Sequence, residues 1–379
     1  MPDLILGKQL EPELAPSAIA QQRLISQRIG TEKGIDPAAV VRWMGAMQAQ
    51  DYGQVMWAVG LRTQSSSVLE VEQAIAHRSI VITWLMRGTI HLVFAEDAQW
   101  MSQLFGPRLL AAAGTRRQQL EIDQALIDRT KTLFCRALRD GQQLTRAAFM
   151  QLLEQAGISP KGQRGYHLLW SLALEGLICF GPRRHHEQTF VLLEEWVPNP
   201  RSLSKEEAVA ELATRYFTSH GPASLHDFAG WTGLPMAEAR RGHEAIKAGL
   251  LTEKVAGSTQ WLSALTSVVA PSGLPRVCLL PGFDEYFLGY KDRSAVLATE
   301  HANHICPGGN GIFKPMLVVD GQIVGTWKPK ISEGKVAVAA QLFLPAQVPQ
   351  AAIEAAAVQY CHFLGLPPGT VTLSEDATD

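Results

Sequence analysis

The sequence predicts an α+β protein that contains three tandem winged helix-turn-helix units and a strand-rich C-terminal region. A pattern of helices followed by two short strands occurs three times before residue 270, and strands predominate after residue 275. The chain has 379 residues, of which 46% are hydrophobic, and is therefore long enough to bury a core in several modules. Short helices with hairpins also fit ordinary α+β packing, so the repeat remains one of two interpretations.

The first predicted unit spans residues 16–96. Apolar residues three and four positions apart predict its helices, and β-branched and aromatic residues predict two strands around the turn Met86-Arg87-Gly88. We expect helices at 17–29, 37–47, 53–62 and 67–78, and strands within 79–94.

The second and third predicted units span residues 97–200 and 201–270. In the second, we expect helices at 124–140, 144–157 and 165–177, and a hairpin at 178–193 with its tip at 181–186. In the third, Ser204 and Glu207 have the spacing of a capping box at a helix start. We expect helices at 205–221, 224–233 and 235–249, and a hairpin at 250–263.

The C-terminal region, residues 271–379, is predicted to be rich in strands and to end in a helix. Asp320-Gly321 is typical of a tight hairpin turn. We expect extended segments at 276–290, 314–329 and 335–345, a closing helix at 346–365 and a frayed tail at 373–379.

Composition excludes several classes of protein. No apolar run approaches the roughly 20 residues that cross a bilayer, and the N-terminus lacks the basic start of a signal peptide. The five cysteines lie far apart without a CxxC pair, so we expect reduced thiols and a cytoplasmic protein. The net charge of −2 argues against a general polyanion binder, but residues 101–150 hold eight basic and four acidic residues. That excess can bind phosphate or simply form a solvated helix surface.

Two glutamines, Gln48 and Gln50, interrupt an apolar stretch. We expect the preceding helix to end near Met47 and Asp51 to begin a turn and cap, which leaves Gln48-Ala49-Gln50 extended. Residues i and i+2 point the same way in an extended segment but lie about 200° apart in a helix. The two amides can therefore converge on a water molecule or a base edge, or they can satisfy carbonyl groups at a helix end.

A second polar set follows in the first predicted hairpin. In a strand, Arg87, Thr89 and His91 alternate onto one face, with apolar residues on the other. A guanidinium, a hydroxyl and an imidazole in a row suit phosphate contact and water positioning. The alternative is the outward polar face of an edge strand.

Asp284 and Glu285 stand in an apolar, strand-like stretch, where a buried carboxylate needs a partner or a shifted pKa. Adjacent residues of a strand face opposite ways, so the two carboxylates make a poor acid–base pair. We expect them to form structural ion pairs with Lys291 or Arg293.

Other chemistries are disfavoured. His301, His304 and Cys306 resemble part of a zinc site, but no fourth ligand is apparent and the neighbouring glycines indicate a loop. No P-loop, no GxGxxG fingerprint at a strand–helix junction and no GxSxG elbow occurs, which argues against nucleotide-driven and serine-hydrolase activities. We therefore expect no metal and no other cofactor.

Four separated motifs together resemble the winged-helix DNA glycosylases of the AlkZ/YcaQ kind. The resemblance covers roughly residues 16–345 and rests on four segments, which are MQAQ, RGTIHLV, LLPGFDEYFLGYKDR and GGNGIFKPMLVVDGQIVGTWK. It implies three winged helices curved around a concave DNA-binding face. It also implies excision of N7-alkylated purines, and some members unhook interstrand crosslinks. The family's catalytic motif is Gln-x-Gln in one branch and Gln-x-Asp in the other, and Gln48-Ala49-Gln50 matches the first, which includes self-resistance proteins of toxin producers.

The resemblance implies that Gln48 and Gln50 are catalytic, with Arg87, Thr89 and His91 as secondary candidates. We expect a monofunctional enzyme, because no lysine near the motif can form a Schiff base. Its partner would be double-stranded DNA with alkylated purines, bound by a monomer. Besides Arg87, the candidate phosphate contacts are Arg116, Arg117, Arg183, Arg184, Arg240 and Arg241, assigned to wing tips and third-helix positions.

A transcriptional regulator is the alternative. In a non-catalytic winged-helix protein, Gln48 and Gln50 would read adenine edges in the major groove. Such a protein binds undamaged DNA with sequence specificity and usually dimerises on spaced half-sites. Three such units in one chain make a dimer less necessary.

Overall fold

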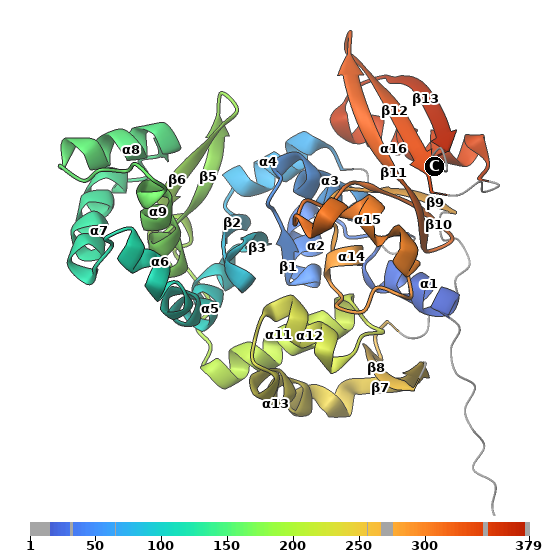
Figure 1. The fold of residues 1–379 in the computed structure, drawn as a ribbon, viewed down its shortest axis with the longest axis horizontal. Helices are drawn as coiled ribbons and strands as arrows, with labels where there is room; N and C mark the ends of the chain where they lie inside the picture. The colour runs from blue at the N-terminus through green and yellow to red at the C-terminus, as the bar shows by residue number, and fades with distance from the viewer. Residues whose placement is uncertain are drawn as a thin grey trace, which may run out of the picture.

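The computed structural model describes residues 16–30, 33–64, 66–255, 257–266, 276–343 and 348–375. Within these residues the fold is α+β, as predicted, with helices packed around a six-stranded sheet, a five-stranded sheet and a two-stranded hairpin (Figure 1). No helix of the described residues is both long and apolar enough to cross a membrane.

The six-stranded sheet joins the first two predicted hairpins. Its strands, in spatial order, are β1 (Ala46–Gln48), β3 (Ile90–Phe94), β2 (Ile80–Trp84), β5 (Ile178–Arg184), β6 (Glu187–Leu192) and β4 (Leu144–Thr145). The two hairpins meet where Ile82 pairs with Phe180. All five residues of β2 are buried, since Ile82 enters one apolar cluster and Val81 enters another on the opposite face. A strand that is buried on both faces consists mainly of apolar residues, as the β2 sequence IVITW does.

Helices precede, connect and follow these strands in residues 16–196. They are α1 (Pro16–Ser26), α2 (Pro37–Met44), α3 (Tyr52–Arg62), α4 (Val68–Ala76), α5 (Ala98–Ala112), α6 (Gly114–Gln119), α7 (Gln124–Leu138), α8 (Arg146–Gln155), α9 (Arg164–Leu174) and α10 (Leu193–Trp196). No helix was predicted from the sequence at α5 or α6. Pro107 lies inside α5, and Gly106 lets this helix approach α9 so closely that a Cβ would stand 2.1 Å from the carbonyl oxygen of Leu174.

The segment predicted as the third unit packs against α2 and α5. It contains α11 (Lys205–Ser219), α12 (Leu225–Thr232), α13 (Met236–Ile246), β7 (Leu250–Val255) and β8 (Ser258–Ser263). The capping box predicted at Ser204 and Glu207 is present at the start of α11. A second one, which Ser224 and Asp227 form, starts α12.

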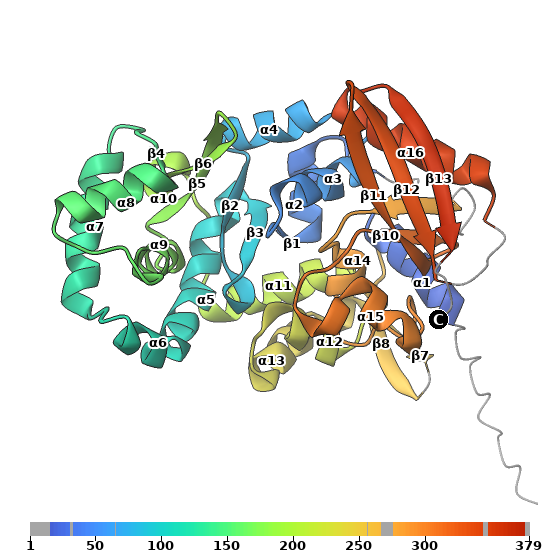
Figure 2. The same cartoon turned by 45° about the horizontal axis from the view of Figure 1, so that its top comes forward.

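The C-terminal region forms the five-stranded sheet. Its order is β13 (Pro368–Glu375), β12 (Lys335–Leu342), β11 (Gln322–Ser332), β10 (Met316–Val319) and β9 (Val277–Leu280), and its helices are α14 (Glu285–Leu288), α15 (Ala302–Ile305) and α16 (Gln350–Leu364). The predicted Asp320-Gly321 turn joins β10 to β11 with positive φ at both residues. Figure 2 shows this sheet and the β5–β6 hairpin on opposite sides of α3 and α4.

Two predictions for this region are wrong. The stretch 276–290 is a strand only as far as Leu280, because the Asp284 side chain caps the short helix α14. Residues 373–375, assigned to a frayed tail, belong to β13, which pairs in parallel with β12. Residues 376–379 lie outside the described residues.

The C-terminal region shares a core with the first half of the chain. The indole of Trp57 on α3 donates a hydrogen bond to the carbonyl of Leu279 at 2.7 Å, and its ring contacts those of Tyr360 and Phe363 on α16. These residues belong to one apolar cluster with Ile82. The region therefore supports the first part of the fold.

Candidate active site

Gln48-Ala49-Gln50 lies at the edge of the six-stranded sheet, where Gln48 is the last residue of β1 and Gln50 lies in a bend. Helix α2 ends at Met44, three residues before the predicted end, because Gly45 takes φ 79°, a conformation that favours glycine. Gln48 ends β1 opposite His91, and the Ala49 N–H continues the pairing with the Ile90 carbonyl at 2.8 Å. The predicted extended backbone is confirmed as far as Gln48, whereas Gln50 lies in a bend, and the predicted cap at Asp51 opens α3.

Both amide side chains lie against the segment 87–90. Arg87 donates from Nη2 to Gln48 Oε1 at 3.2 Å, and the Ile90 N–H donates to Gln50 Oε1 at 3.2 Å. Gln48 is half-buried and Gln50 is exposed. Because an amide oxygen has two lone pairs, each can still accept a hydrogen bond from a further group.

The predicted row of Arg87, Thr89 and His91 does not form. Arg87 lies in the turn between the strands with φ 58°, and β3 begins only at Ile90, so strand alternation does not extend back to Arg87. The Thr89 hydroxyl donates to the Met86 carbonyl. His91 is fully buried, and burial, with the positive charge of Arg87, lowers its pKa to about 4. Of the three, only Arg87 contacts a glutamine side chain.

Three parts of the chain meet at this turn. The Trp170 indole on α9 donates to the carbonyl of Gly88 at 3.2 Å. Gly233, at the end of α12, lies so near Arg87 that a Cβ would stand 2.9 Å from Arg87 Cγ. Arg108 on α5 donates to the Gly233 carbonyl at 2.8 Å. The position of Arg87 beside Gln48 thus depends on α5, α9 and α12.

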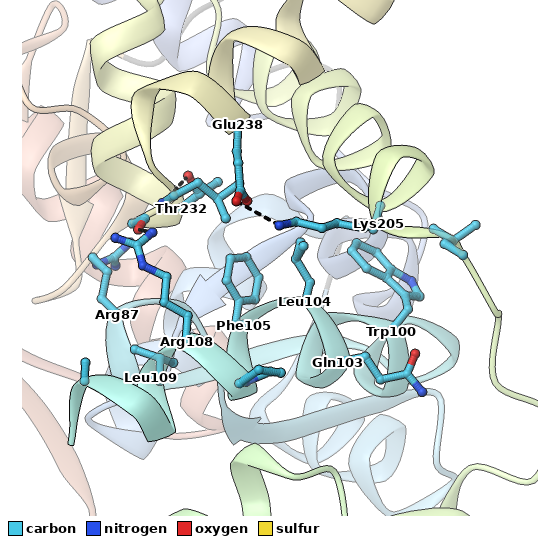
Figure 3. A pocket seen from close by; sticks show the side chains of 16 residues that line it. Arg87, Trp100, Gln103, Leu104, Phe105, Arg108, Leu109, Lys205, Thr232 and Glu238 are labelled. Carbon is cyan, nitrogen blue, oxygen red and sulfur yellow. Dashed lines mark hydrogen bonds and ion pairs between the residues drawn. The ribbon is translucent and has the colours of Figure 1, made fainter. Parts of the chain in front are cut away.

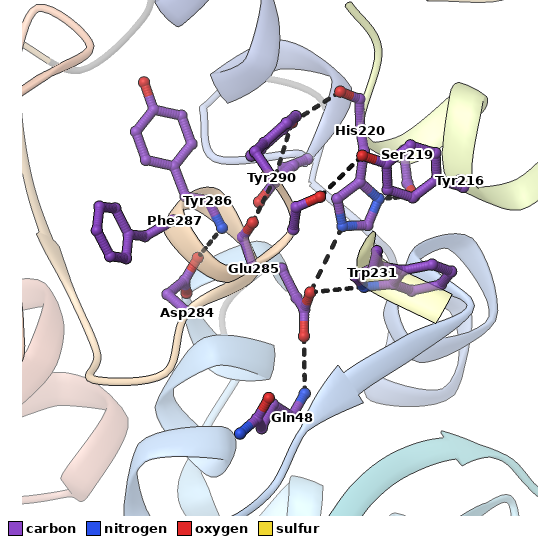
Figure 4. Close-up of polar contacts among 12 residues, drawn as sticks. Gln48, Tyr216, Ser219, His220, Trp231, Asp284, Glu285, Tyr286, Phe287 and Tyr290 are labelled. Carbon is purple, nitrogen blue, oxygen red and sulfur yellow. Dashed lines mark hydrogen bonds and ion pairs between the residues drawn. The ribbon is translucent and has the colours of Figure 1, made fainter. Parts of the chain in front are cut away.

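A buried carboxylate lies behind Gln48 (Figure 4). Glu285 Oε1 accepts a hydrogen bond from the Gln48 backbone N–H at 2.8 Å, and Oε2 accepts one from the Trp231 indole at 2.9 Å. His220 Nε2 stands 3.6 Å from Oε2. Sequence reasoning missed this contact, because it joins residues 237 positions apart.

The electrostatics keep Glu285 ionised and His220 neutral. Burial raises the pKa of the Glu285 carboxyl, but His220 and the Gln48 N–H outweigh burial, and its pKa lies below the ordinary value. Burial lowers the pKa of His220. Glu285 is therefore an anion inside the protein.

The ion pairs predicted for Asp284 and Glu285 are wrong. Asp284 pairs with Arg62 through two hydrogen bonds, at 2.7 and 2.9 Å, and both side chains are fully buried. Arg293 instead donates to the Phe287 carbonyl. The error followed from reading 284–290 as a strand, since the helix α14 points both carboxylates toward the first part of the chain.

The candidate DNA-binding arginines lie at three places. Arg183 and Arg184 end β5 beside the turn of the β5–β6 hairpin, and the Arg183 guanidinium lies 4.4 Å from the ring centre of Tyr52. Arg240 and Arg241 are exposed on α13. The assignment of Arg116 and Arg117 to a wing tip or third helix is wrong, because both lie on the short helix α6.

A cavity of about 580 Å³ separates α5 from α11 and α12. Figure 3 shows Leu104 and Phe105 on one wall and Thr232 on the other, with Arg87 at one end. An ion pair at 2.8 Å joins Lys205 of α11 to Glu238 of α13 on the side of the cavity opposite Leu104 and Phe105. Arg87 is common to this cavity and to the Gln48 contact.

The segment that contains His301, His304 and Cys306 packs against an aromatic side chain. The rings of His301 and His304 lie within 5 Å of the Phe343 ring, centre to centre. Among the described residues, no group of three or more His, Cys, Asp and Glu side chains has a metal-binding arrangement. Cys306 lies 3.8 Å from the side-chain oxygen of Asn310.

The fold and these contacts define an α+β protein with a half-buried amide, Gln48, held between an arginine and a buried anion, and an exposed amide, Gln50, two residues away. A family model described as "DNA glycosylase AlkZ-like" matches residues 41–363, and the chain belongs to this family. The interstrand DNA cross-link repair glycosylase of Streptomyces sahachiroi is 27% identical over an alignment of 336 positions that covers 80% of this chain and 85% of that protein. The solved structure of the Streptomyces sahachiroi DNA glycosylase AlkZ superimposes with a TM-score of 0.79 and 23% identity, covering 96% of this chain and 100% of that one.

Proposed function

We propose that the protein removes N7-alkylated purines from double-stranded DNA by hydrolysing the N-glycosidic bond, and that Gln48 and Gln50 are its catalytic residues. The observation that carries this proposal is the contact of both amide side chains with the segment 87–90 at the edge of the sheet, where Gln48 is half-buried and Gln50 is exposed. Family membership supports a DNA glycosylase over the transcriptional regulator considered as the alternative.

We also propose that three winged helix-turn-helix units carry the DNA-binding surface, at residues 16–96, 97–200 and 201–270, with 271–379 as a supporting region. In each, three helices precede a hairpin: α2–α4 before β2–β3, α7–α9 before β5–β6, and α11–α13 before β7–β8. Hairpin ends and third helices are the parts of such units that meet DNA. Arg183, Arg184, Arg240 and Arg241 lie on such elements.

The chemistry follows from the charge of the lesion. Alkylation at N7 makes the purine cationic, so it leaves without protonation by an acid. The bond between C1′ and the base breaks with its electron pair passing to the purine, and the water oxygen bonds to C1′. The products are a neutral alkylated purine, an abasic sugar and a proton that passes to solvent.

Neutral amides suit this reaction. A glutamine is not a base at pH 7, but its oxygen can accept a hydrogen bond from the attacking water and hold it in line with C1′. Orientation and electrostatic stabilisation then supply the acceleration. An unmodified purine is a poor leaving group without an acid, which makes the enzyme selective for cationic lesions. Among the described residues, no lysine bonds to either amide, which supports base excision without strand cleavage.

A crosslink in DNA is a further candidate substrate. The Streptomyces sahachiroi relative is named as an interstrand cross-link repair glycosylase. A crosslinked base cannot rotate freely out of the duplex. The exposed position of Gln50 suits a base that stays close to the DNA duplex. All five cysteines are free, which supports a reducing compartment, and we propose that the enzyme acts as a cytoplasmic monomer.

The experiment compares two duplexes that differ only in one N7-methylguanine. The protein is incubated with each, and abasic sites are cleaved with alkali and counted. We expect abasic sites in the methylated duplex alone. Equal binding to both duplexes without any abasic site would instead support the regulator.

A further inference from the structure

We propose that Glu285 is a positioning residue for this reaction, which holds Gln48 through its backbone N–H and places a full negative charge behind the two neutral amides. The inference rests on the proposed glycosylase function. Its basis is the contact between Glu285 Oε1 and the Gln48 N–H at 2.8 Å, from a carboxylate that is 2% exposed (Figure 4).

Glu285 lacks the paired arginine that its neighbour has. Its neighbour Asp284, equally buried, has a full counterion in Arg62. Glu285 instead contacts the Gln48 N–H, the Trp231 indole and the neutral His220. A buried anion without a contacting cation destabilises a fold. A neutral side chain of the same shape would destabilise the fold less. The presence of a carboxylate at this position therefore points to a role in the reaction.

The arrangement places Gln48 between two charges. Its backbone N–H binds Glu285, and its side-chain oxygen accepts from Arg87, whose charge interacts with that of Glu285. The two contacts fix the main chain and the amide orientation of one residue. A positioned group whose geometry is held from both ends needs no reorganisation when the reaction occurs.

The charge has the sign that the reaction requires. Departure of the purine leaves positive charge on the deoxyribose, and the two amides carry no net charge to offset it. A carboxylate in a buried, low-dielectric position exerts a stronger field than one in water. Glu285 is buried behind Gln48, so we infer that it acts through Gln48 and through its field.

The test is substitution of Glu285 by Gln, which keeps the shape and removes the charge. A glutamine amide would face the Trp231 donor, so Glu285→Gln is also made in a Trp231→Phe background and compared with Trp231→Phe alone. We expect Glu285→Gln to lower the single-turnover rate of N7-methylguanine release on the order of 10²-fold, both relative to the unsubstituted protein and relative to Trp231→Phe alone. Affinity for the methylated duplex should not change. Asp284→Asn is the matched control, which should lower the melting temperature but reduce the rate far less.

The outcomes are distinct. A folded Glu285→Gln protein that releases base at the unsubstituted rate overturns the proposal, as does an equal rate loss in Asp284→Asn. If neither Glu285→Gln protein folds, Glu285 serves the fold alone and the proposal is again overturned. If the unsubstituted protein releases no N7-methylguanine, the proposed function itself fails. This result distinguishes a failure of the proposed function from a failure of the role proposed for Glu285.

Discussion

Gln48 is held at both ends by residues that are remote from it in the sequence. Arg87 is 39 positions away and Glu285 is 237 positions away. The side-chain amide therefore has a defined orientation before any DNA binds. Gln50 has one such contact, with the Ile90 N–H, and is more exposed. We infer that Gln48 is the more rigid of the two amides and Gln50 the more accessible.

His91 predicts an acid sensitivity of the fold. Its pKa is about 4 in the folded protein and 6.5 ordinarily, so between these pH values the unfolded chain binds more protons. Stability should therefore be lost as pH falls from about 6.5 to 4, by roughly 1.4 kcal/mol per pH unit for this one proton. Urea unfolding at several pH values measures this slope, and His91→Leu should reduce it by about one proton. An unchanged slope in His91→Leu would show that His91 is not buried in its neutral form.

At the residue scale, sequence reasoning succeeded where the information is local. The extended backbone at Gln48 and the Asp51 cap were predictable, because both depend on a few adjacent residues. The partners of Glu285 were not, because they come from β1, α11 and α12. Apolar neighbours on both sides indicated that this carboxylate is buried but carried no information about what it would bind.

At the scale of elements, the β5–β6 hairpin connects the proposed DNA surface to the site. Its Arg183 guanidinium lies over the ring of Tyr52, two residues after Gln50. Arg184 pairs with Glu187 in the strand register next to the turn. A hairpin that approaches both the glutamines and solvent can hold the DNA backbone near the reacting sugar.

Replacement of Arg183 and Arg184 by Ala should weaken DNA binding and flatten its salt dependence. If each arginine neutralises one phosphate, the slope of log K against log salt should decrease by about 2. Fluorescence anisotropy with a methylated duplex at several salt concentrations measures this slope. Arg139→Ala is the control, because that guanidinium is paired with Glu194. A slope equal to that of the unsubstituted protein would remove this hairpin from the DNA footprint.

Elements differ in how well the sequence predicted them. The helix α11 was clear, because a capping box opens an amphipathic stretch. The stretch 276–290 was misread, because aromatic and aliphatic residues favour a strand and a buried short helix alike. Helix α5 was missed because Gly106 and Pro107 argue against a helix, although Gly106 is what permits its close contact with α9.

At the scale of the molecule, the site is assembled from both ends of the chain. Gln48 ends β1 and Gln50 follows it, the arginine that orients Gln48 lies between β2 and β3, and the carboxylate comes from the C-terminal region. That region packs into the same apolar cluster as α3. None of the three proposed units contains the complete set, so we infer that an isolated N-terminal unit would lack activity even if it bound DNA.

The central claim is that Gln48 and Gln50 direct water onto the sugar of a cationic purine nucleotide. The most direct test is the single-turnover release of N7-methylguanine from duplex DNA by Gln48→Ala and Gln50→Ala, with enzyme in saturating excess so that binding does not limit the rate. The account predicts that each rate falls on the order of 10²-fold while duplex affinity is retained. Release at the unsubstituted rate by both variants would contradict it.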